Sequence, residues 1–516
     1  MVWPRLRHGS QGGRALSSVV QGYNPRTGEP FGEPVAKTPD SEVDRIASAA
    51  AVAFPAWSAV PAADRAVVLE EVADALDAES ELLVSTADTE TALGVPRLTT
   101  ELKRTTNQLR LFAEVLREGS YVEATLDSAN PDIIPPRPEL RRVLRPLGTV
   151  AVFSASNFPF AFSVAGGDTA SALASGCPVV VKAHSAHPST SRETARVVVD
   201  ALRAAGAPEG VFGIVYGTQA GVALVQHPDV RAVGFTGSTG GGRALFDLAQ
   251  GRPDPIPFYG ELGSVNPTVI LPGAAEREDI ATGFAQSLTM GVGQFCTNPG
   301  LVFAPSALVP ALGEAVEATT GGAMLNERMC DSYTASTDAL AASDLVTVVS
   351  AGTRPDEAWA VSPRLFSVPV AVFEENLEKL TEEHFGPAAL VVTYSSPAEL
   401  HSVLAKLPGT LTGTVHAAES DHAEAAEVAE VLRRVAGRII FNAWPTGVAV
   451  AWGQHHGGPW PATTNPLHTS VGATSIRRWI APVTYQSWPD ALLPAELQEA
   501  NPLGIPRRVD GVLGVH

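Results

Sequence analysis

Three residues with complementary chemistry stand out in the sequence: Cys296, Glu261 and Asn157. Cys296 lies in GVGQFCTNPG (291–300), Glu261 in FYGELGSVNP, and Asn157 in SASNFPFAFS (154–163). A thiolate attacks a carbonyl carbon readily, and a carboxylate within reach can activate the water that cleaves the resulting thioester. A side-chain amide can donate a hydrogen bond to the oxyanion that forms in between. Together the three residue types predict covalent aldehyde or acyl chemistry.

Taken singly, these residues have simpler explanations. An isolated cysteine is more often buried filler, and an isolated glutamate is usually a solvated surface group. Asn157 could be a turn residue before Pro159. The elements around the three residues must therefore decide between the chemical and the structural interpretation.

The middle of the sequence alternates short apolar runs with helical segments. Valine-rich runs suit strands buried on both faces of a parallel sheet, and the segments between them are long enough for right-handed crossover helices. The runs are TVAVF at 149–153, PVVVK at 178–182, VFGIVY at 211–216 and RAVGF at 231–235. They predict an α/β fold with a doubly wound sheet, and a second alternation that begins with PTVIL (267–271) predicts another α/β domain. One crossover helix is expected at about 189–205, with Ser189 or Thr190 as its N-cap.

Polar residues follow the predicted strands at the sheet edge where ligands bind in such folds. Lys182 and Ser185 follow one strand, and Gly237 and Ser238 follow another within GFTGSTGGG (234–242). Free amide groups at the start of the next helix could hold a pyrophosphate, so we expect a dinucleotide there. The usual G-x-G-x-x-G fingerprint is missing after the first strand, and a glycine-rich turn without a ligand is the alternative.

The composition argues against several function classes. A net charge of −19 and a pI near 5.1 argue against nucleic acid as a partner, because such binding needs clustered Lys and Arg. No run reaches about 18 uninterrupted apolar residues, so we expect no membrane span. Three scattered cysteines, Cys177, Cys296 and Cys330, predict neither a disulfide framework nor a metal site and fit a reducing cytoplasm. Cys177 precedes a valine run and should pack in a core.

Six motifs, in this order and rough spacing, resemble those of the aldehyde dehydrogenase superfamily. They are Asn157 in NFP, Lys182 in VVVKAH, GFTGST, Glu261 in GELGS, Cys296 in GQFCTNPG and EEHFGP at 382–387. The similarity extends from about Asn24 to about Gln486 and implies an aldehyde dehydrogenase-like fold. GELGSVNP, FCTNPG and GQHHGGPWPATT (453–464) look closest to the branch that oxidises 2-oxoglutarate semialdehyde (2,5-dioxopentanoate) and to its NADP-using relatives.

The resemblance implies a role for each of the three residues. Cys296 would be the nucleophile that forms a thiohemiacetal with an aldehyde. Asn157 and the backbone N–H of Cys296 would hold the oxyanion, an effect worth about 3 kcal/mol per donor in acyl-transfer sites. Glu261 would activate water against the thioester and release the acid.

The cofactor residues are also carried over from the resemblance. It assigns Lys182 to the adenosine ribose, Ser238 with its neighbour Gly237 to the pyrophosphate, and Glu383 with Phe385 to the nicotinamide half. Many NAD-preferring relatives have a glutamate three residues after that lysine, where this chain has Ser185. A carboxylate there would repel a 2′-phosphate, whereas a serine beside a lysine could accept it. We therefore expect NADP, with NAD as a second cofactor that the chain could use.

The chain departs from the superfamily at the position of a proton-relay lysine. Many superfamily members have a lysine nine residues after the oxyanion asparagine, but here that position is Gly166, so no proton relay can pass through it.

His455 and His456 invite a metal or general-base role, yet adjacent histidines usually point in different directions. A loop that lines the substrate entrance is the preferred interpretation. Trp444 and Trp460 could shape that entrance or pack in a core.

A chain of 516 residues should form two to four units. The Pro-rich stretch 121–147 could extend from the body as an arm, and superfamily members are typically dimers or tetramers in which such an arm extends a neighbour's sheet. The expected organisation is a dinucleotide-binding domain (18–120 and 148–262), an oligomerisation arm (121–147 and 479–490), a catalytic domain (263–478) and tails (1–17 and 491–516).

The leading hypothesis is NAD(P)-dependent oxidation of an aldehyde to a carboxylic acid, with 2-oxoglutarate semialdehyde as the substrate. Medium-chain aliphatic aldehydes are an alternative. A CoA-acylating dehydrogenase is opposed by Glu261, since acylating relatives generally lack a glutamate base there. A silent binding or structural homologue is opposed by the intact set of Cys296, Glu261 and Asn157.

Overall fold

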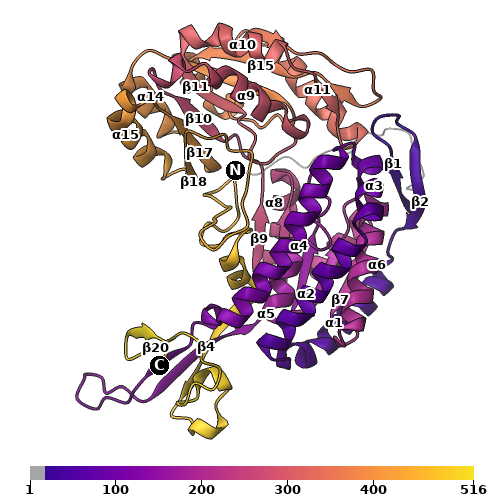
Figure 1. The fold of residues 1–516 in the computed structure, drawn as a ribbon, viewed down its shortest axis with the longest axis vertical. Helices are drawn as coiled ribbons and strands as arrows, with labels where there is room; N and C mark the ends of the chain where they lie inside the picture. Colours follow the sequence, from indigo (N-terminus) through magenta and orange to yellow (C-terminus); the bar gives the residue numbers. More distant parts are fainter. Residues whose placement is uncertain (1–17) are drawn as a thin grey trace.

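The computed structural model describes residues 18–516, so the tail expected at 1–17 lies outside the described residues. Two α/β bodies stand one above the other in Figure 1, and an arm of strands projects from the lower body. Three larger sheets account for most of the strands. This is the predicted α/β architecture, with two parallel sheets and a small arm.

The first body is built on a five-stranded parallel sheet in the order β7-β6-β5-β8-β9. Its strands are β5 (Thr149–Phe153), β6 (Val179–Lys182), β7 (Phe212–Val215), β8 (Val230–Thr236) and β9 (Phe258–Glu261). The four strands predicted from valine-rich runs are confirmed. The order places the switch point between β5 and β8, where a crevice opens at the carboxyl ends of the strands.

Helices cover both faces of this sheet, which is why its strands are mostly apolar. Val150 and Val152 pack into a core with α2 to α6, whereas Ala151 and Phe153 pack into a second core with α1 and α7. The helices are α1 (Asp40–Ala59), α2 (Ala62–Ala78), α3 (Ser80–Thr91), α4 (Val95–Glu118), α5 (Gly167–Ser175), α6 (Pro188–Ala204), α7 (Thr218–Gln226) and α8 (Thr239–Gln250). A hairpin of β1 (Val19–Tyr23) and β2 (Pro30–Ala36) contacts α3 and α6. Cys177 is fully buried in the larger core, as predicted.

The start of α6 differs from the sequence prediction. The helix begins at Pro188 with His187 at the N-cap, so neither Ser189 nor Thr190 is the cap. The backbone N–H groups of Ser189 and Thr190 instead donate to the buried carboxylate of Glu90 on α3, at 2.9 and 2.8 Å. A side chain from another helix therefore satisfies the helix end.

The second body holds a seven-stranded sheet in the order β13-β15-β16-β11-β10-β17-β18, parallel except for the edge strand β13. Its strands are β10 (Pro267–Ile270), β11 (Leu301–Pro305), β13 (Thr347–Ala351), β15 (Arg364–Pro369), β16 (Ala388–Tyr394), β17 (Thr410–His416) and β18 (Ala436–Phe441). The helices of this body are α9 (Asp279–Thr289), α10 (Val309–Glu317), α11 (Glu327–Ala341), α12 (Val370–Glu375), α13 (Leu377–Leu380), α14 (Pro397–Leu404) and α15 (His422–Leu432). Strands β12 (Gly322–Ala323) and β14 (Ala360–Val361) form a separate short pair.

The arm is a five-stranded sheet in the order β19-β4-β3-β20-β21. Its strands are β3 (Thr125–Asp127), β4 (Leu140–Pro146), β19 (Ile480–Gln486), β20 (Arg507–Val509) and β21 (Val512–Gly514). Residues 491–516 were expected to form a tail, and the structure corrects this because β20 pairs in parallel with β3. Arg507, which is 2% exposed, donates to the carbonyl oxygens of Gln498 and Glu499 and fixes the segment in place.

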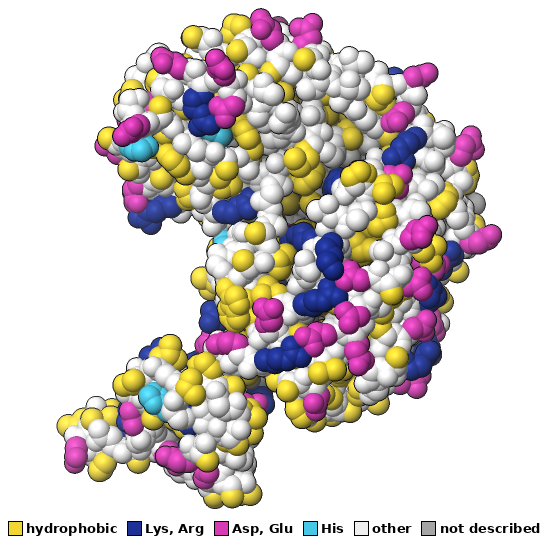
Figure 2. Space-filling model, viewed as in Figure 1, with side chains coloured by type: hydrophobic (Ala, Val, Ile, Leu, Met, Phe, Trp, Pro, Cys, Tyr) yellow, Lys and Arg dark blue, Asp and Glu magenta, His cyan; other side chains and the backbone are white. Residues whose placement is uncertain are grey.

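The surface is mixed in charge. On the face shown in Figure 2, Lys and Arg side chains are interspersed with Asp and Glu over the lower body. A broad hollow separates the upper body from the arm in the same view. In residues 18–516 no helix is both long and apolar enough to cross a membrane.

Candidate functional site

Cys296 lies in the loop between a 3-10 turn, Met290–Gly293, and β11. Asn266 holds this loop, because its buried side-chain amide donates to the carbonyl oxygens of Cys296 and Asn298 at 2.8 and 2.9 Å. A Cβ on Gly293 would come within 2.4 Å of the backbone of Gly386, so only glycine permits this approach. The loop that carries the thiol is therefore packed against the loop that carries Glu383. Asn266 lies within the GELGSVNP motif, but no role was predicted for it.

Asn157 follows β5 and is brought to the same loop. Its side-chain amide donates to the carbonyl oxygen of Gln294 at 2.9 Å, two residues before Cys296. Its own carbonyl oxygen accepts from Arg97 of α4 at 2.6 Å. Because a primary amide has two N–H donors, one remains after the bond to Gln294.

Glu261 ends β9 and is buried, with 8% exposure. Its Oε2 atom has no hydrogen-bond partner among the described residues. Burial raises the pKa of Glu261 well above its usual value, the nearby Arg478 opposes this rise, and the charge of Asp168 adds to it. A carboxylate with a raised pKa and a free oxygen is well suited to take a proton from water.

The pKa of Cys296 indicates which charges surround it. Burial raises the pKa of the thiol to about 12, the carboxylates of Glu261 and Glu383 add to the rise, and Arg438 opposes it. The structure thus brings Cys296, Glu261 and Glu383 close enough to interact through their charges. The raised pKa favours the neutral thiol of Cys296, so deprotonation of Cys296 needs a nearby proton acceptor.

His456 was expected in a loop that lines the substrate entrance, and the structure places it against Cys296. Its Nε2 atom lies 3.6 Å from Cys296 Sγ, and the side chain is 2% exposed. Burial lowers the pKa of His456 to about 3, and Arg438 and Arg104 contribute, so the imidazole is neutral. Thr469 holds the backbone of His456, whose N–H donates to Thr469 Oγ1 at 2.8 Å. The glycine-rich loop therefore reaches the thiol of Cys296 and does not merely line an entrance.

Glu383 and Phe385 lie beside Cys296 on the loop before β16. Both line a small pocket together with Ser264, Phe295 and Asn298. Burial raises the pKa of Glu383 to about 7, and the backbone N–H of Ser264 partly offsets this. A Cβ on Gly263 would lie 2.4 Å from Glu383 Oε2, so the absence of a side chain there makes room for the carboxylate.

The remaining predicted cofactor residues lie at the carboxyl ends of β6 and β8. Ser238 is the N-cap of α8 and accepts from the backbone N–H of Gly241 at 3.3 Å, while Ser185 and Gly237 are exposed. Desolvation lowers the pKa of Lys182 to about 8. Within residues 18–516 its ammonium group makes no hydrogen bond or ion pair. An unpaired cation and an exposed helix N-terminus at the same edge of the sheet fit the ribose and phosphates of a dinucleotide.

Gly166 has a steric reason for being glycine. It is the N-cap of α5, and a Cβ there would lie 2.5 Å from the carbonyl oxygen of Ala161 and 2.8 Å from the backbone nitrogen of Ser163. No side chain fits at this position without moving the backbone. The site must therefore work without the lysine that other superfamily members carry.

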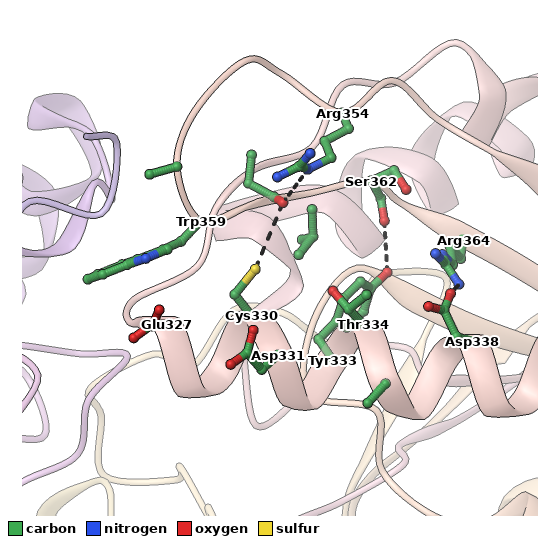
Figure 3. Close-up of a pocket in the computed structure, with 14 residues that line it drawn as sticks. Glu327, Cys330, Asp331, Tyr333, Thr334, Asp338, Arg354, Trp359, Ser362 and Arg364 are labelled. Carbon is green, nitrogen blue, oxygen red and sulfur yellow. Dashed lines mark hydrogen bonds and ion pairs between the residues drawn. The ribbon is translucent and has the colours of Figure 1, made fainter. Parts of the chain in front are cut away.

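A larger pocket of about 750 Å³ lies apart from these residues, between α11 and the loop that carries Arg354 and Trp359 (Figure 3). Charged side chains line it, among them Asp331 and Asp338 of α11 and Arg354 across the opening. Cys330 borders it, with Sγ 3.9 Å from the carbonyl oxygen of Ala360. None of the predicted site residues lines this pocket.

One group of side chains in residues 18–516 has the spacing of metal ligands: His401, Glu424 and Glu427, on α14 and α15. His401 Nε2 lies 2.8 Å from Glu424 Oε1, so a direct contact accounts for their proximity. Trp444 is half-buried and packs against the core, with its ring centroid 4.4 Å from that of His416. Trp460 is 49% exposed.

The fold and this arrangement define the class of protein. The sequence matches the aldehyde dehydrogenase family over residues 14–459. The chain therefore belongs to the aldehyde dehydrogenase family, as the resemblance implied.

Particular relatives narrow the comparison. Alpha-ketoglutaric semialdehyde dehydrogenase 2 of Azospirillum brasilense is 45% identical over 514 residues, which cover 98% of each chain. Alpha-ketoglutaric semialdehyde dehydrogenase of Acinetobacter baylyi is 42% identical over 507 residues, 97% of this chain and 96% of the relative. Among solved structures, a mutant of aldehyde dehydrogenase C from Pseudomonas syringae with NAD+ and octanal has a TM-score of 0.79. It is 22% identical and covers 93% of this chain and 95% of that one.

Proposed function

We propose that the protein oxidises 2-oxoglutarate semialdehyde to 2-oxoglutarate with NAD(P). Two relatives with that activity in their names match nearly the whole chain at 45% and 42% identity. The observation that carries the chemistry is the cluster of Cys296 with the buried carboxylate of Glu261 and the neutral ring of His456. It joins a nucleophile to a base in a desolvated site.

In the proposed reaction Cys296 Sγ attacks the aldehyde carbon and gives a thiohemiacetal. The free amide hydrogen of Asn157 and the backbone N–H of Cys296 hold the oxyanion. The bond from Asn157 to Gln294 and the bond from Arg97 to the Asn157 carbonyl oxygen keep that amide at the loop. A bound dinucleotide would supply the hydride acceptor that converts the thiohemiacetal on Cys296 to a thioester.

Glu261 completes the proposed reaction. Its free Oε2 takes a proton from a water molecule, which attacks the thioester and releases the acid and the thiol. Because burial raises its pKa, Glu261 also accepts the Cys296 proton more readily than an exposed carboxylate would. His456 is positioned to accept a hydrogen bond from the thiol and so to fix its direction.

We propose NADP as the preferred cofactor, with NAD also usable. Lys182 would contact the ribose with Ser185 beside the 2′-phosphate, Gly237 and Ser238 would hold the pyrophosphate, and Glu383 with Phe385 would face the nicotinamide half. Support comes from the unpaired ammonium of Lys182 and from the exposed serine where a repelling carboxylate would otherwise stand. A titration of the two cofactors at fixed aldehyde tests this, and a higher kcat/KM for NAD would reverse the order.

We also propose the domain assignment and the assembly. Residues 18–120 with 148–262 bind the dinucleotide, 263–478 carry the nucleophile, and the arm of 121–147 with 479–490 joins subunits into a homodimer or homotetramer. The edge strand β19 supports this, since its outer edge is unpaired among the described strands and Val483 is 42% exposed. Sedimentation that gives a monomer would contradict the assembly.

We also propose a cytoplasmic location, because the free thiol of Cys296 suits a reducing compartment.

The proposed activity is tested by absorbance at 340 nm, with NADP or NAD and a panel of aldehydes. We expect 2,5-dioxopentanoate to give the highest kcat/KM and Cys296→Ala to abolish the signal. Higher values for octanal or another medium-chain aldehyde would favour the broader alternative. Turnover only in the presence of CoA would indicate an acylating enzyme, and silence on every aldehyde with a reduced thiol would indicate a binding or structural homologue.

A further inference from the structure

Arg104 has a guanidinium group that is only partly satisfied. It lies on α4, and both terminal nitrogens, Nη1 and Nη2, are buried without a hydrogen-bond partner in residues 18–516. Only Nε is bonded, to the carbonyl oxygen of Val448 at 3.3 Å. A buried guanidinium with two unbonded terminal nitrogens is costly unless an acceptor completes it. The two terminal nitrogens present the fork geometry that pairs with a carboxylate.

This fork lies beside the nucleophile. The charge of Arg104 interacts with Cys296 and also with His456. The guanidinium carbon lies 5.2 Å from the ring centroid of Phe162, and that ring is 6.1 Å from the ring of His456. Arg104, Phe162 and His456 therefore form one continuous wall next to Cys296.

The position of Arg104 is fixed from two sides. The Phe162 ring lies next to one side of the guanidinium, and the Val448 carbonyl oxygen holds Nε. Arg438 in turn holds the loop before Val448, with Nη1 2.6 Å from the Gly447 oxygen and Nη2 2.7 Å from the Pro445 oxygen. The fork is thus held in place before any ligand binds, which reduces the entropy cost of binding.

The other buried charges on α4 are each bonded through one terminal atom, although Arg97 Nη1 and Glu101 Oε2 are unpaired among the described residues. Arg97 donates to the Asn157 carbonyl oxygen and lies 4.7 Å from the Phe295 ring centroid. Glu101 accepts from the backbone N–H groups of Phe160 and Ala161, at 2.9 and 3.0 Å. Glu101 interacts with Arg104 through charge, but within the described chain the two form no ion pair. Arg104 is therefore the buried cation on α4 with both terminal nitrogens unbonded among the described residues.

We propose that the Nη1–Nη2 fork of Arg104 binds the carboxylate at the far end of an oxo-acid aldehyde while Cys296 attacks its aldehyde carbon. Arg104 then selects aldehydes that carry a carboxylate over uncharged aldehydes of the same length. The inference rests on the proposed function in that it assumes aldehyde oxidation at Cys296, and it deepens that function by assigning the group that recognises the acid.

The alternative is that Arg104 acts on the thiolate of Cys296. That role would help every aldehyde equally, because it does not depend on the far end of the substrate. A matched pair of substrates separates the two roles: 5-oxopentanoate and pentanal have the same number of carbons and differ in the terminal carboxylate.

The experiment compares kcat/KM for this pair in the wild type, in Arg104→Gln and in Arg104→Lys. We expect Arg104→Gln to lower the ratio of 5-oxopentanoate to pentanal by about 100-fold, mainly through KM, and to leave pentanal within about threefold. Arg104→Lys keeps the charge but loses the fork, so its ratio should fall about tenfold. The control is Arg117→Gln, which removes one charge from the exposed end of the same helix and should leave the ratio unchanged.

Equal losses on both substrates, or an unchanged ratio, would overturn the proposal, and so would a wild type without preference for 5-oxopentanoate. Should Arg104→Gln fail to fold, the ratio for Arg104→Lys decides: a lowered value supports the fork and the wild-type value overturns it. The test does not use 2,5-dioxopentanoate. A poor rate on that compound would therefore count against the proposed substrate and leave the role of Arg104 standing.

Discussion

His456 Nε2 lies 3.6 Å from Cys296 Sγ although the two residues are 160 positions apart in the sequence. The imidazole is buried beside the thiol, and burial, helped by the charges of Arg438 and Arg104, lowers its pKa, so it approaches the sulfur as a neutral ring. A neutral ring accepts a hydrogen bond from the thiol but does not stabilise a thiolate by charge. The contact therefore restricts the direction of the sulfur.

Removal of this contact should slow the attack on the aldehyde. We expect His456→Ala to lower kcat/KM by about tenfold for charged and uncharged aldehydes alike, because the thiol loses its orienting partner. His456→Gln retains an acceptor and should recover part of the rate. The measurement is steady-state kinetics with the 5-oxopentanoate and pentanal pair, and His455→Ala is the neighbouring control. A loss confined to one substrate would contradict a role at the sulfur.

Glu261 should control the pH dependence of turnover. Its pKa lies well above the usual value because it is buried, and it acts as a base only when deprotonated, so kcat should rise with pH as Glu261 loses its proton. Glu261→Gln should remove this rise and lower kcat by about 100-fold or more, while a single, slower burst of reduced cofactor remains because the Cys296 proton has lost its acceptor. Stopped-flow absorbance measures both. A burst at the wild-type rate would show that Glu261 does not accept the Cys296 proton.

Glu383 should reduce the stability of the free enzyme at neutral pH. Its pKa is about 7 in the folded state against 4.5 for the ordinary group, so the folded protein binds the proton more tightly than the unfolded chain. Stability is then lost as pH rises from 4.5 to about 7. Glu383→Gln should raise the free energy of unfolding by up to about 3 kcal/mol near pH 8 and have little effect near pH 4. Urea unfolding without cofactor at the two pH values checks this, and an equal effect at both would contradict it.

Asn266 should be essential for the shape of the nucleophile loop. Asn266→Asp replaces the amide that donates to the Cys296 and Asn298 carbonyl oxygens by a carboxylate that faces them. We expect a loss of about 2 to 4 kcal/mol in the free energy of unfolding and a loss of activity. The same exchange at exposed Asn107 is the matched control and should change little. Retained activity in Asn266→Asp would show that the loop does not depend on this amide.

The glycine at position 166 should tolerate no substitution. Gly166→Ala forces a Cβ to within 2.5 Å of the Ala161 carbonyl oxygen, so we expect about 2 kcal/mol or more of destabilisation, and Gly166→Lys should be worse. Gly453→Ala is the control, since a Cβ there meets nothing within 4 Å. Thermal unfolding of the three variants tests the point. A stable and faster Gly166→Lys protein would show that the backbone can yield.

Much of the parallel sheet in the first body was predictable because its strands are buried on both faces. Each strand then appears in the sequence as a continuous apolar run, such as TVAVF at 149–153. Such a run can be recognised without knowing which strands lie next to it in the sheet. The residues of the nucleophile loop also stand in short local motifs. Their types and order in the sequence are enough to suggest the chemistry.

The contacts that were missed depend on residues far apart in the chain. His456 reaches Cys296 across 160 positions, and the start of α6 is satisfied by Glu90 from another helix. Neither has a local signal. The β20–β21 hairpin did have one, since Asp510 and Gly511 have φ of 46° and 86° and form the Asp-Gly turn typical of such hairpins.

The arm sheet also sets an order in which the chain can be assembled during synthesis. Strand β4 pairs along its whole length with β19, from Leu140 opposite Gln486 to Pro146 opposite Ile480. More than 300 residues must therefore be translated before β4 meets this partner, which takes roughly 20 to 70 s at common elongation rates. During that interval one edge of the nascent arm is open to pairing with other chains. A ribosome-bound chain is thus open to misassembly at β4 while the sheets of both α/β bodies are still being made.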